Sequence, residues 1–74
     1  MELKEIHTRG ATVLLTTDEL LTISNALNEV CNGIDLPEFA TRMGVERAIA
    51  ECLLKHVSAL YDKVALPSEA TPLP

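Results

Sequence analysis

Aromatic residues are nearly absent from this sequence, and tryptophan is missing altogether. The 74 residues include one Phe and one Tyr, so 3% of the chain is aromatic while 47% is hydrophobic. A chain of this size hides roughly 60% of its extended surface on folding, which is enough for one small core. We therefore expect a single aliphatic core, and the length excludes separate cofactor and substrate domains.

Basic residues are scarce as well. Six Lys and Arg stand against eleven Asp and Glu, which gives a formal net charge of −5. Proteins that bind nucleic acid usually show the reverse balance, because they neutralise phosphates with Lys and Arg. The composition therefore disfavours nucleic acid and favours a basic protein partner, which an acidic surface attracts.

Long apolar runs are also missing. No stretch approaches the roughly 18 consecutive apolar residues of a membrane-spanning helix, so no membrane association is expected. The first residues, Met1 to Glu5, lack the basic region and the apolar core of a signal peptide. The sequence thus predicts a cytoplasmic protein.

No catalytic or metal-binding motif is present. Cys31 and Cys52 lack the close spacing of zinc ribbons and thioredoxin-like sites, and in a cytoplasmic chain we expect buried free thiols, although their pairing stays open. His56 follows Cys52 by one helical turn, but one such pair supplies only half of a four-ligand site. We expect no enzyme, no metal and no cofactor.

The first sixteen residues predict a β-hairpin. Residues 11–16 are rich in β-branched side chains, with Ala11, Val13 and Leu15 on one face. Residues 8–10 form a three-residue loop in which Gly10 takes the left-handed conformation. Residues 2–7 supply the first strand.

Two helices are expected next. Thr16 and Glu19 form a capping box for a helix over residues 18–31, which Gly33 ends as a left-handed cap. A short second helix is capped by Asp35, with Glu38 as the box partner. It ends at Gly44.

A long third helix is predicted from Val45 to Val64. Its apolar positions recur at steps of three and four and form the predicted inner face: Val45, Ala48, Ile49, Cys52, Leu53, His56, Val57, Leu60, Tyr61 and Val64. Residues 1–65 make one compact domain, and residues 66–74 make a flexible Pro-rich tail. The fold class is α+β, mostly α, with an N-terminal β-hairpin followed by three helices.

Three predicted surface features point to a partner. Several leucines lie off the predicted inner faces, namely Leu14, Leu21, Leu54 and Leu66, and together they predict a patch for a partner or for a homodimer, unless they complete the core. The free edges of the hairpin also favour a homodimer. A polar face on the first helix, Asn25, Asn28, Glu29 and Asn32, is either a solvated surface or a partner-binding site.

DNA binding is the alternative function. Residues 39–45 and the helix that follows resemble a helix-turn-helix motif, with Gly44 at the turn. Arg42 and Arg47 are its candidate DNA contacts, but Glu46 and Glu51 face phosphates poorly. This alternative is a dimeric transcriptional regulator.

A further resemblance extends over residues 11–55. The runs at residues 18–21, 25–34 and 38–45 (DELL, NALNEVCNGI and EFATRMGV) resemble small bacterial proteins. Some of these are similar to immunity proteins of polymorphic or contact-dependent toxin systems. The resemblance implies a cytoplasmic protein that binds and blocks one toxin domain, and it transfers no site residue.

The leading prediction is therefore a protein-binding module, an immunity or antitoxin-like inhibitor of a basic toxin domain. A structural subunit of a larger assembly is a third option.

Overall fold

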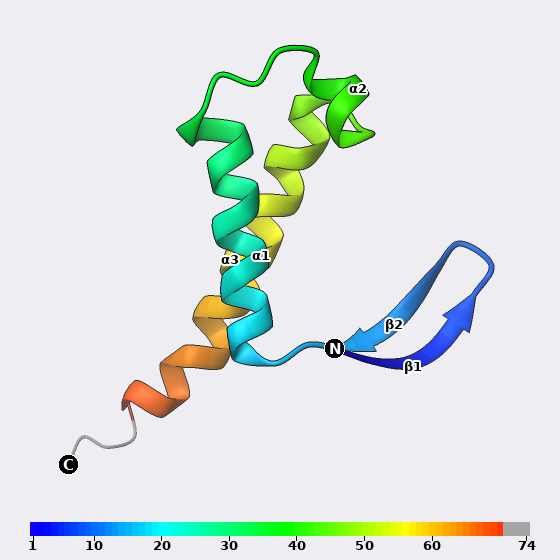
Figure 1. Ribbon diagram of the computed structural model, residues 1–74. Helices are drawn as coiled ribbons and strands as arrows, with labels where there is room; N and C mark the ends of the chain where they lie inside the picture. Colours follow the sequence, from blue (N-terminus) through cyan, green and yellow to red (C-terminus); the bar gives the residue numbers. More distant parts are fainter. Residues whose placement is uncertain (71–74) are drawn as a thin grey trace.

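The chain folds into a β-hairpin, a pair of long helices and a short connecting helix (Figure 1). The computed structural model describes the backbone of residues 1–70 and the side chains of residues 1–65. The elements follow in the order β1 (Glu2–His7), β2 (Gly10–Leu14), α1 (Thr17–Asn28), the π-helical turn η1 (Glu29–Gly33), α2 (Phe39–Met43) and α3 (Arg47–Ala70). The predicted class, α+β and mostly α with an N-terminal hairpin and three helices, is confirmed.

The hairpin has a tighter loop than the sequence predicts. β1 and β2 are antiparallel, and His7 pairs with Gly10, so only Thr8 and Arg9 lie between the strands. Gly10 belongs to β2 and does not have a positive φ, so its predicted left-handed role is wrong. The strand pairing extends to His7 and Gly10, so Thr8 and Arg9 form the loop and no left-handed glycine is needed in it.

The capping box of α1 is confirmed. The Glu19 amide donates to Thr16 Oγ1 at 3.1 Å, and the Thr16 amide donates to Glu19 Oε1 at 2.9 Å. Two backbone donors at the start of the helix are therefore satisfied by its own sequence.

The end of the first helix differs from the prediction. α1 gives way to the π-helical turn η1, in which the Ile34 amide donates to the Glu29 carbonyl at 3.0 Å. Gly33 does not have a positive φ, so its predicted left-handed cap is wrong. Gly33 instead leaves room for the Glu29 side chain, because a Cβ at this position would lie 2.8 Å from the carboxyl carbon of Glu29.

The short helix α2 starts without the predicted capping box. Glu38 is the residue just before the helix, has a left-handed backbone (φ 53°), and makes no side-chain cap. It therefore stands at the cap position itself and not three residues inside the helix, where a box partner for Asp35 would have to be. The predicted end is confirmed: Gly44 has φ 86°, and its amide donates to the Ala40 carbonyl at 2.8 Å.

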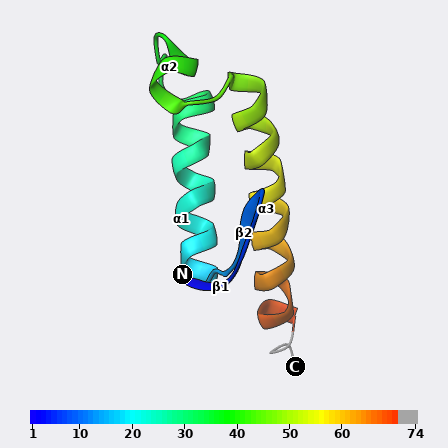
Figure 2. The same cartoon turned by 90° about the vertical axis from the view of Figure 1, so that its right-hand side faces the viewer.

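The core lies where α1 and α3 run antiparallel, side by side (Figures 1 and 2). One buried cluster joins Leu20, Leu27 and Val57, and a second joins Cys31, Phe39 and Ala50. Leu54 is half-buried and packs against both clusters. A hydrogen bond of 2.8 Å between the Ser24 and Ser58 hydroxyls also links the two helices.

The predicted inner face of the third helix is mostly wrong. Leu54 was expected outside the core but packs against both clusters. Most residues expected inside are exposed, namely Val45, Ala48, Ile49, Cys52, Leu53, His56, Leu60 and Val64. The helix carries two parallel apolar stripes one residue apart, and α1 covers only the stripe that contains Ala50, Leu54, Val57 and Tyr61.

α3 also ends later than predicted. Its backbone stays helical from Arg47 to Ala70, past the expected end at Val64 and into the predicted tail over residues 66–74. Residues 71–74 of that tail lie outside the described residues, and the predicted flexibility stays a prediction.

Candidate protein-binding surfaces

An apolar stripe runs along α3 on a side that α1 does not cover. We call Ile49, Leu53, Leu60 and Val64 the outer stripe. Between 46% and 57% of each of these residues is exposed. Beside it lies an open hollow of about 310 Å³, lined by His56, Ala59, Leu60 and Lys63. An amphipathic helix of a globular protein normally exposes its polar face, so this stripe is suited to bind another protein surface.

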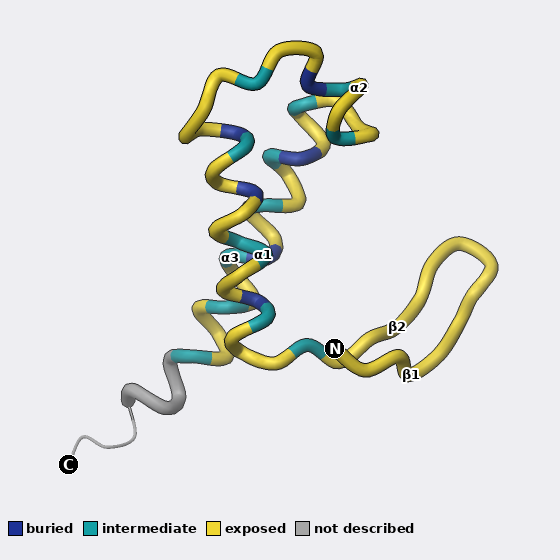
Figure 3. Tube along the Cα trace, viewed as in Figure 1, coloured by how far each residue is buried: buried dark blue, intermediate teal, exposed yellow. Residues whose placement is uncertain are grey.

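The hairpin carries a second uncovered apolar surface. Leu3 pairs with Val13 and Ile6 pairs with Ala11, and paired residues of an antiparallel ladder point to the same face. Ala11 and Val13 are two residues apart on β2, and a register shift between Leu3 and Glu5 keeps Leu3 and Ile6 in step with them, so both pairs share one face. We call these four residues the hairpin face. All residues of both strands are exposed (Figure 3), Ile6 by 75% and Leu3 by 56%. A two-stranded hairpin with no covering layer is at best marginally stable in water.

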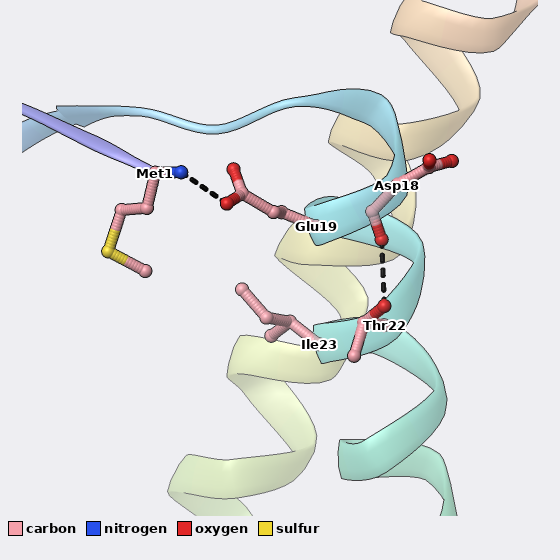
Figure 4. Close-up of a pocket in the computed structure, with 5 residues that line it drawn as sticks. All are labelled: Met1, Asp18, Glu19, Thr22 and Ile23. Carbon is pink, nitrogen blue, oxygen red and sulfur yellow. Dashed lines mark hydrogen bonds and ion pairs between the residues drawn. The ribbon is translucent and has the colours of Figure 1, made fainter.

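A small hollow lies where the start of the chain meets α1 (Figure 4). It measures about 220 Å³ and is lined by Met1, Asp18, Glu19, Thr22 and Ile23. The N-terminal ammonium donates to Glu19 Oε2 at its edge, and the Thr22 hydroxyl donates to the Asp18 carbonyl at 2.8 Å.

The ammonium and the Thr16 amide stabilise the charged form of Glu19, which lowers the pKa of its carboxyl below the ordinary 4.5. These contacts tie the start of β1 to the first turn of α1, and they bring no base and nucleophile together.

The predicted polar face is present as one surface. Asn25, Asn28, Glu29 and Asn32 are all exposed, and the Asn32 side-chain amide donates to Asn28 Oδ1 at 3.0 Å. The face lies away from Leu20 and Leu27, which turn toward α3. Its last two residues, Glu29 and Asn32, belong to η1, and Asn28 borders the start of η1. π-helical turns occur frequently at functional sites, so the backbone of η1 also favours this face as a binding site.

The two arginines of the DNA-binding alternative lie in different environments. Arg42 is exposed, but Arg47 is half-buried, with its Nη1 donating to the Cys31 carbonyl at 2.5 Å. The Arg47 guanidinium also lies 4.5 Å from the centre of the Phe39 ring. Arg47 therefore ties η1 and α2 to the start of α3, and its Nη1 and one face of its guanidinium are engaged there. No local spacing in the sequence signals this role.

The cysteines are free, but their burial differs from the prediction. Cys31 is buried and Cys52 is exposed, so the expected burial is wrong for Cys52, which lies at the margin of the outer stripe. Among the described residues, no group of three His, Cys, Asp or Glu side chains is placed to hold a metal ion. None of the helices in the described part of the chain combines the length and the apolarity needed to cross a membrane.

No protein-family model, curated protein or solved structure matches the chain. The proposed function therefore depends on the two uncovered apolar surfaces and on the polar face of α1.

Proposed function

We propose that this chain is a small protein-binding module. The observation that carries the proposal is the amount of uncovered apolar surface: among residues 1–65, twelve large apolar residues are exposed, by 37% to 75%. Single exposed apolar residues are ordinary, but contiguous ones on a small chain are typical of binding surfaces.

The thickness of the chain supports the same proposal. Its extents are 49 × 33 × 16 Å, so the chain is long and thin. Domains normally pack two layers of secondary structure around a core. α1 and α3 form such layers, but among the described residues the hairpin face and the outer stripe have no layer over them, and a bound protein surface would supply one.

We further propose that the module inhibits a basic partner, as an immunity or antitoxin-like protein does. The net charge of −5 supports a basic partner, because complementary charge accelerates association and disfavours wrong partners. The polar face of α1 is the proposed recognition surface, since Glu29 and three asparagines offer acceptors and donors without being used in the core. In this proposal the protein acts in the cytoplasm.

Affinity capture with the chain as bait tests this function. We expect a basic protein in stoichiometric amount, released as salt rises. The double variant Asn28→Ala/Glu29→Ala should bind it at least about tenfold more weakly, because the central residues of an interface carry most of its affinity.

Asp62→Ala is the matched control, since Asp62 is an exposed acidic residue on α3, outside the polar face of α1. An acidic partner held independently of salt would contradict the basic-partner proposal. If the double variant and the control bind the partner equally well, the polar face is not the recognition surface.

DNA binding is not favoured by any contact in the described residues. Its candidate Arg47 is engaged by Cys31 and Phe39, which leaves Arg42 as the one available arginine of the pair.

A further inference from the structure

We propose that a second copy of this chain covers the two apolar surfaces: the hairpin face of each copy docks on the outer stripe of the other. This inference rests on the proposed protein-binding function, and it identifies a second copy of the chain as the partner of both apolar surfaces. The polar face of α1 stays outside this contact and remains available to a different partner.

The area of exposed surface is the first argument. The chain exposes 5650 Å². A folded monomer of this length exposes about 4,450 Å², so the excess is about 1,200 Å² per chain. A stable interface of standard size buries about 800 Å² of each partner. The excess is therefore large enough for a stable dimer.

The shape of the chain agrees with the area. The radius of gyration is 14.8 Å, whereas a compact domain of this length has about 11 Å. The hairpin contributes to this difference, because it projects away from the helix pair (Figure 1). Within the described residues, β1 and β2 pack extensively only against each other. The hairpin is thus an arm with an apolar face and no surface of its own chain beneath it.

The two uncovered surfaces fit each other in kind and in length. Each is an apolar strip, one on a sheet and one on a helix. The strands have five and six residues, or about 17–20 Å at the rise of a strand. The outer stripe from Ile49 to Val64 spans about 22 Å at 1.5 Å per residue, so strands of this length would cover most of it. The hollow beside Leu60 would accept a side chain such as Ile6.

Symmetry makes a second copy the natural occupant. In a two-fold dimer, one hairpin-to-helix contact is repeated by the other copy, so both surfaces of both chains are covered at once. A different protein would have to supply a helix-like surface for the hairpin and a separate surface for the stripe.

The test uses purified protein alone, measured by sedimentation equilibrium and native mass spectrometry over a range of concentrations. The wild-type chain should be a dimer. Ile6→Lys, in the hairpin face, and Leu53→Glu, in the outer stripe, should each raise the dissociation constant at least about tenfold. Both residues are largely exposed, so neither charge enters the monomer core. Leu21→Glu, an exposed leucine on α1 outside both surfaces, should leave the dimer unchanged.

Mixing the two variants identifies which surfaces meet. In a heterodimer of Ile6→Lys and Leu53→Glu, both substitutions fall in one contact, where they attract, and the other contact is wild-type. Native mass spectrometry should therefore show the mixed dimer although each variant alone is monomeric.

Other outcomes would overturn the proposal. A monomeric wild-type chain at 100 µM, on the order of a weak dissociation constant, rules out the dimer. Loss of dimer in Leu53→Glu alone would mean that the helices pair with each other, and loss in Ile6→Lys alone would mean that the hairpins do. If a charged variant loses its helical circular dichroism, Ile6→Ser and Leu53→Gln replace the pair, with Leu21→Gln as control.

This result is independent of the proposed inhibitor function. A monomer that still captures a basic partner through the polar face would contradict the dimer alone. A dimer that captures no such partner would contradict the inhibitor function alone.

Discussion

The helix pair and the hairpin of this chain are stabilised in very different ways. α1 and α3 bury two clusters between them and share the Ser24–Ser58 hydrogen bond, whereas every residue of the two strands is exposed. The helices thus have a core of their own, while the hairpin has backbone hydrogen bonds and little else. In the proposed dimer, the hairpin would gain the covering surface that the helix pair already has.

The largest expected effect comes from comparing a core leucine of α3 with its exposed neighbour. Leu54→Ala removes a side chain that packs against both clusters, and we expect a loss of about 2–4 kcal/mol in the free energy of unfolding. Leu53→Ala, at the neighbouring exposed position, should cost the isolated chain less than about 0.5 kcal/mol. Urea unfolding at low protein concentration measures both. Similar losses in the two variants would mean that the buried stripe is assigned to the wrong side of α3.

The next effect concerns the junction of η1, α2 and α3. Arg47→Ala removes the bond to the Cys31 carbonyl and the contact with the Phe39 ring, and should lower the free energy of unfolding by about 1–3 kcal/mol. Arg42→Ala, at an exposed position, should have almost no effect.

The same two variants test the DNA-binding alternative. A titration with duplex DNA should show no salt-sensitive binding by the wild-type chain. Salt-sensitive binding lost equally in both variants would restore that alternative.

A smaller effect separates the two glycines of the connecting region. Gly44→Ala places a Cβ on a left-handed backbone with φ 86° and should cost about 1 kcal/mol. Gly33→Ala meets only the flexible end of the Glu29 side chain, so its cost should stay within about 0.5 kcal/mol. Thermal unfolding of the two variants compares them directly, and a larger loss at Gly33 would show that Glu29 cannot move away.

The smallest effect lies at the contact between the hairpin and α1. The pKa of Glu19 is lowered by the N-terminal ammonium and the Thr16 amide. Its contribution to stability is therefore complete above the ordinary pKa of 4.5 and is lost as the pH falls through the lowered value. Glu19→Gln should flatten the acid side of the stability profile, whereas Glu2→Gln should not. An unchanged profile in Glu19→Gln would show that this contact makes no difference in solution.

The sequence predicted the features whose cause is local. The Thr16–Glu19 capping box, the end of α2 at Gly44 and the hairpin itself each depend on residues within a few positions of one another. These signals act through the backbone of one segment, so an isolated sequence contains them. The polar face of α1 was predicted for the same reason, because helical spacing alone puts its four residues on one side.

The features that the sequence did not predict depend on contacts between distant segments. α3 has two apolar stripes one residue apart, and only the position of α1 decides that Leu54 is covered and Leu53 is not. The sequence did not predict the structural contacts of Arg47, because its partners Cys31 and Phe39 lie in other elements of the chain. Gly10 and Gly33 were given left-handed roles, since composition cannot tell a glycine needed for its backbone from one that sits in a strand or leaves room for Glu29.

The most direct test of the central claim is amide hydrogen exchange of the hairpin as a function of protein concentration. If a second copy covers the hairpin face, the amides of β1 and β2 should exchange almost freely in dilute protein and become protected as the dimer forms, while the central amides of α1 stay protected throughout. Exchange in β1 and β2 that does not change with concentration, at concentrations that span the expected dimer, would contradict the account.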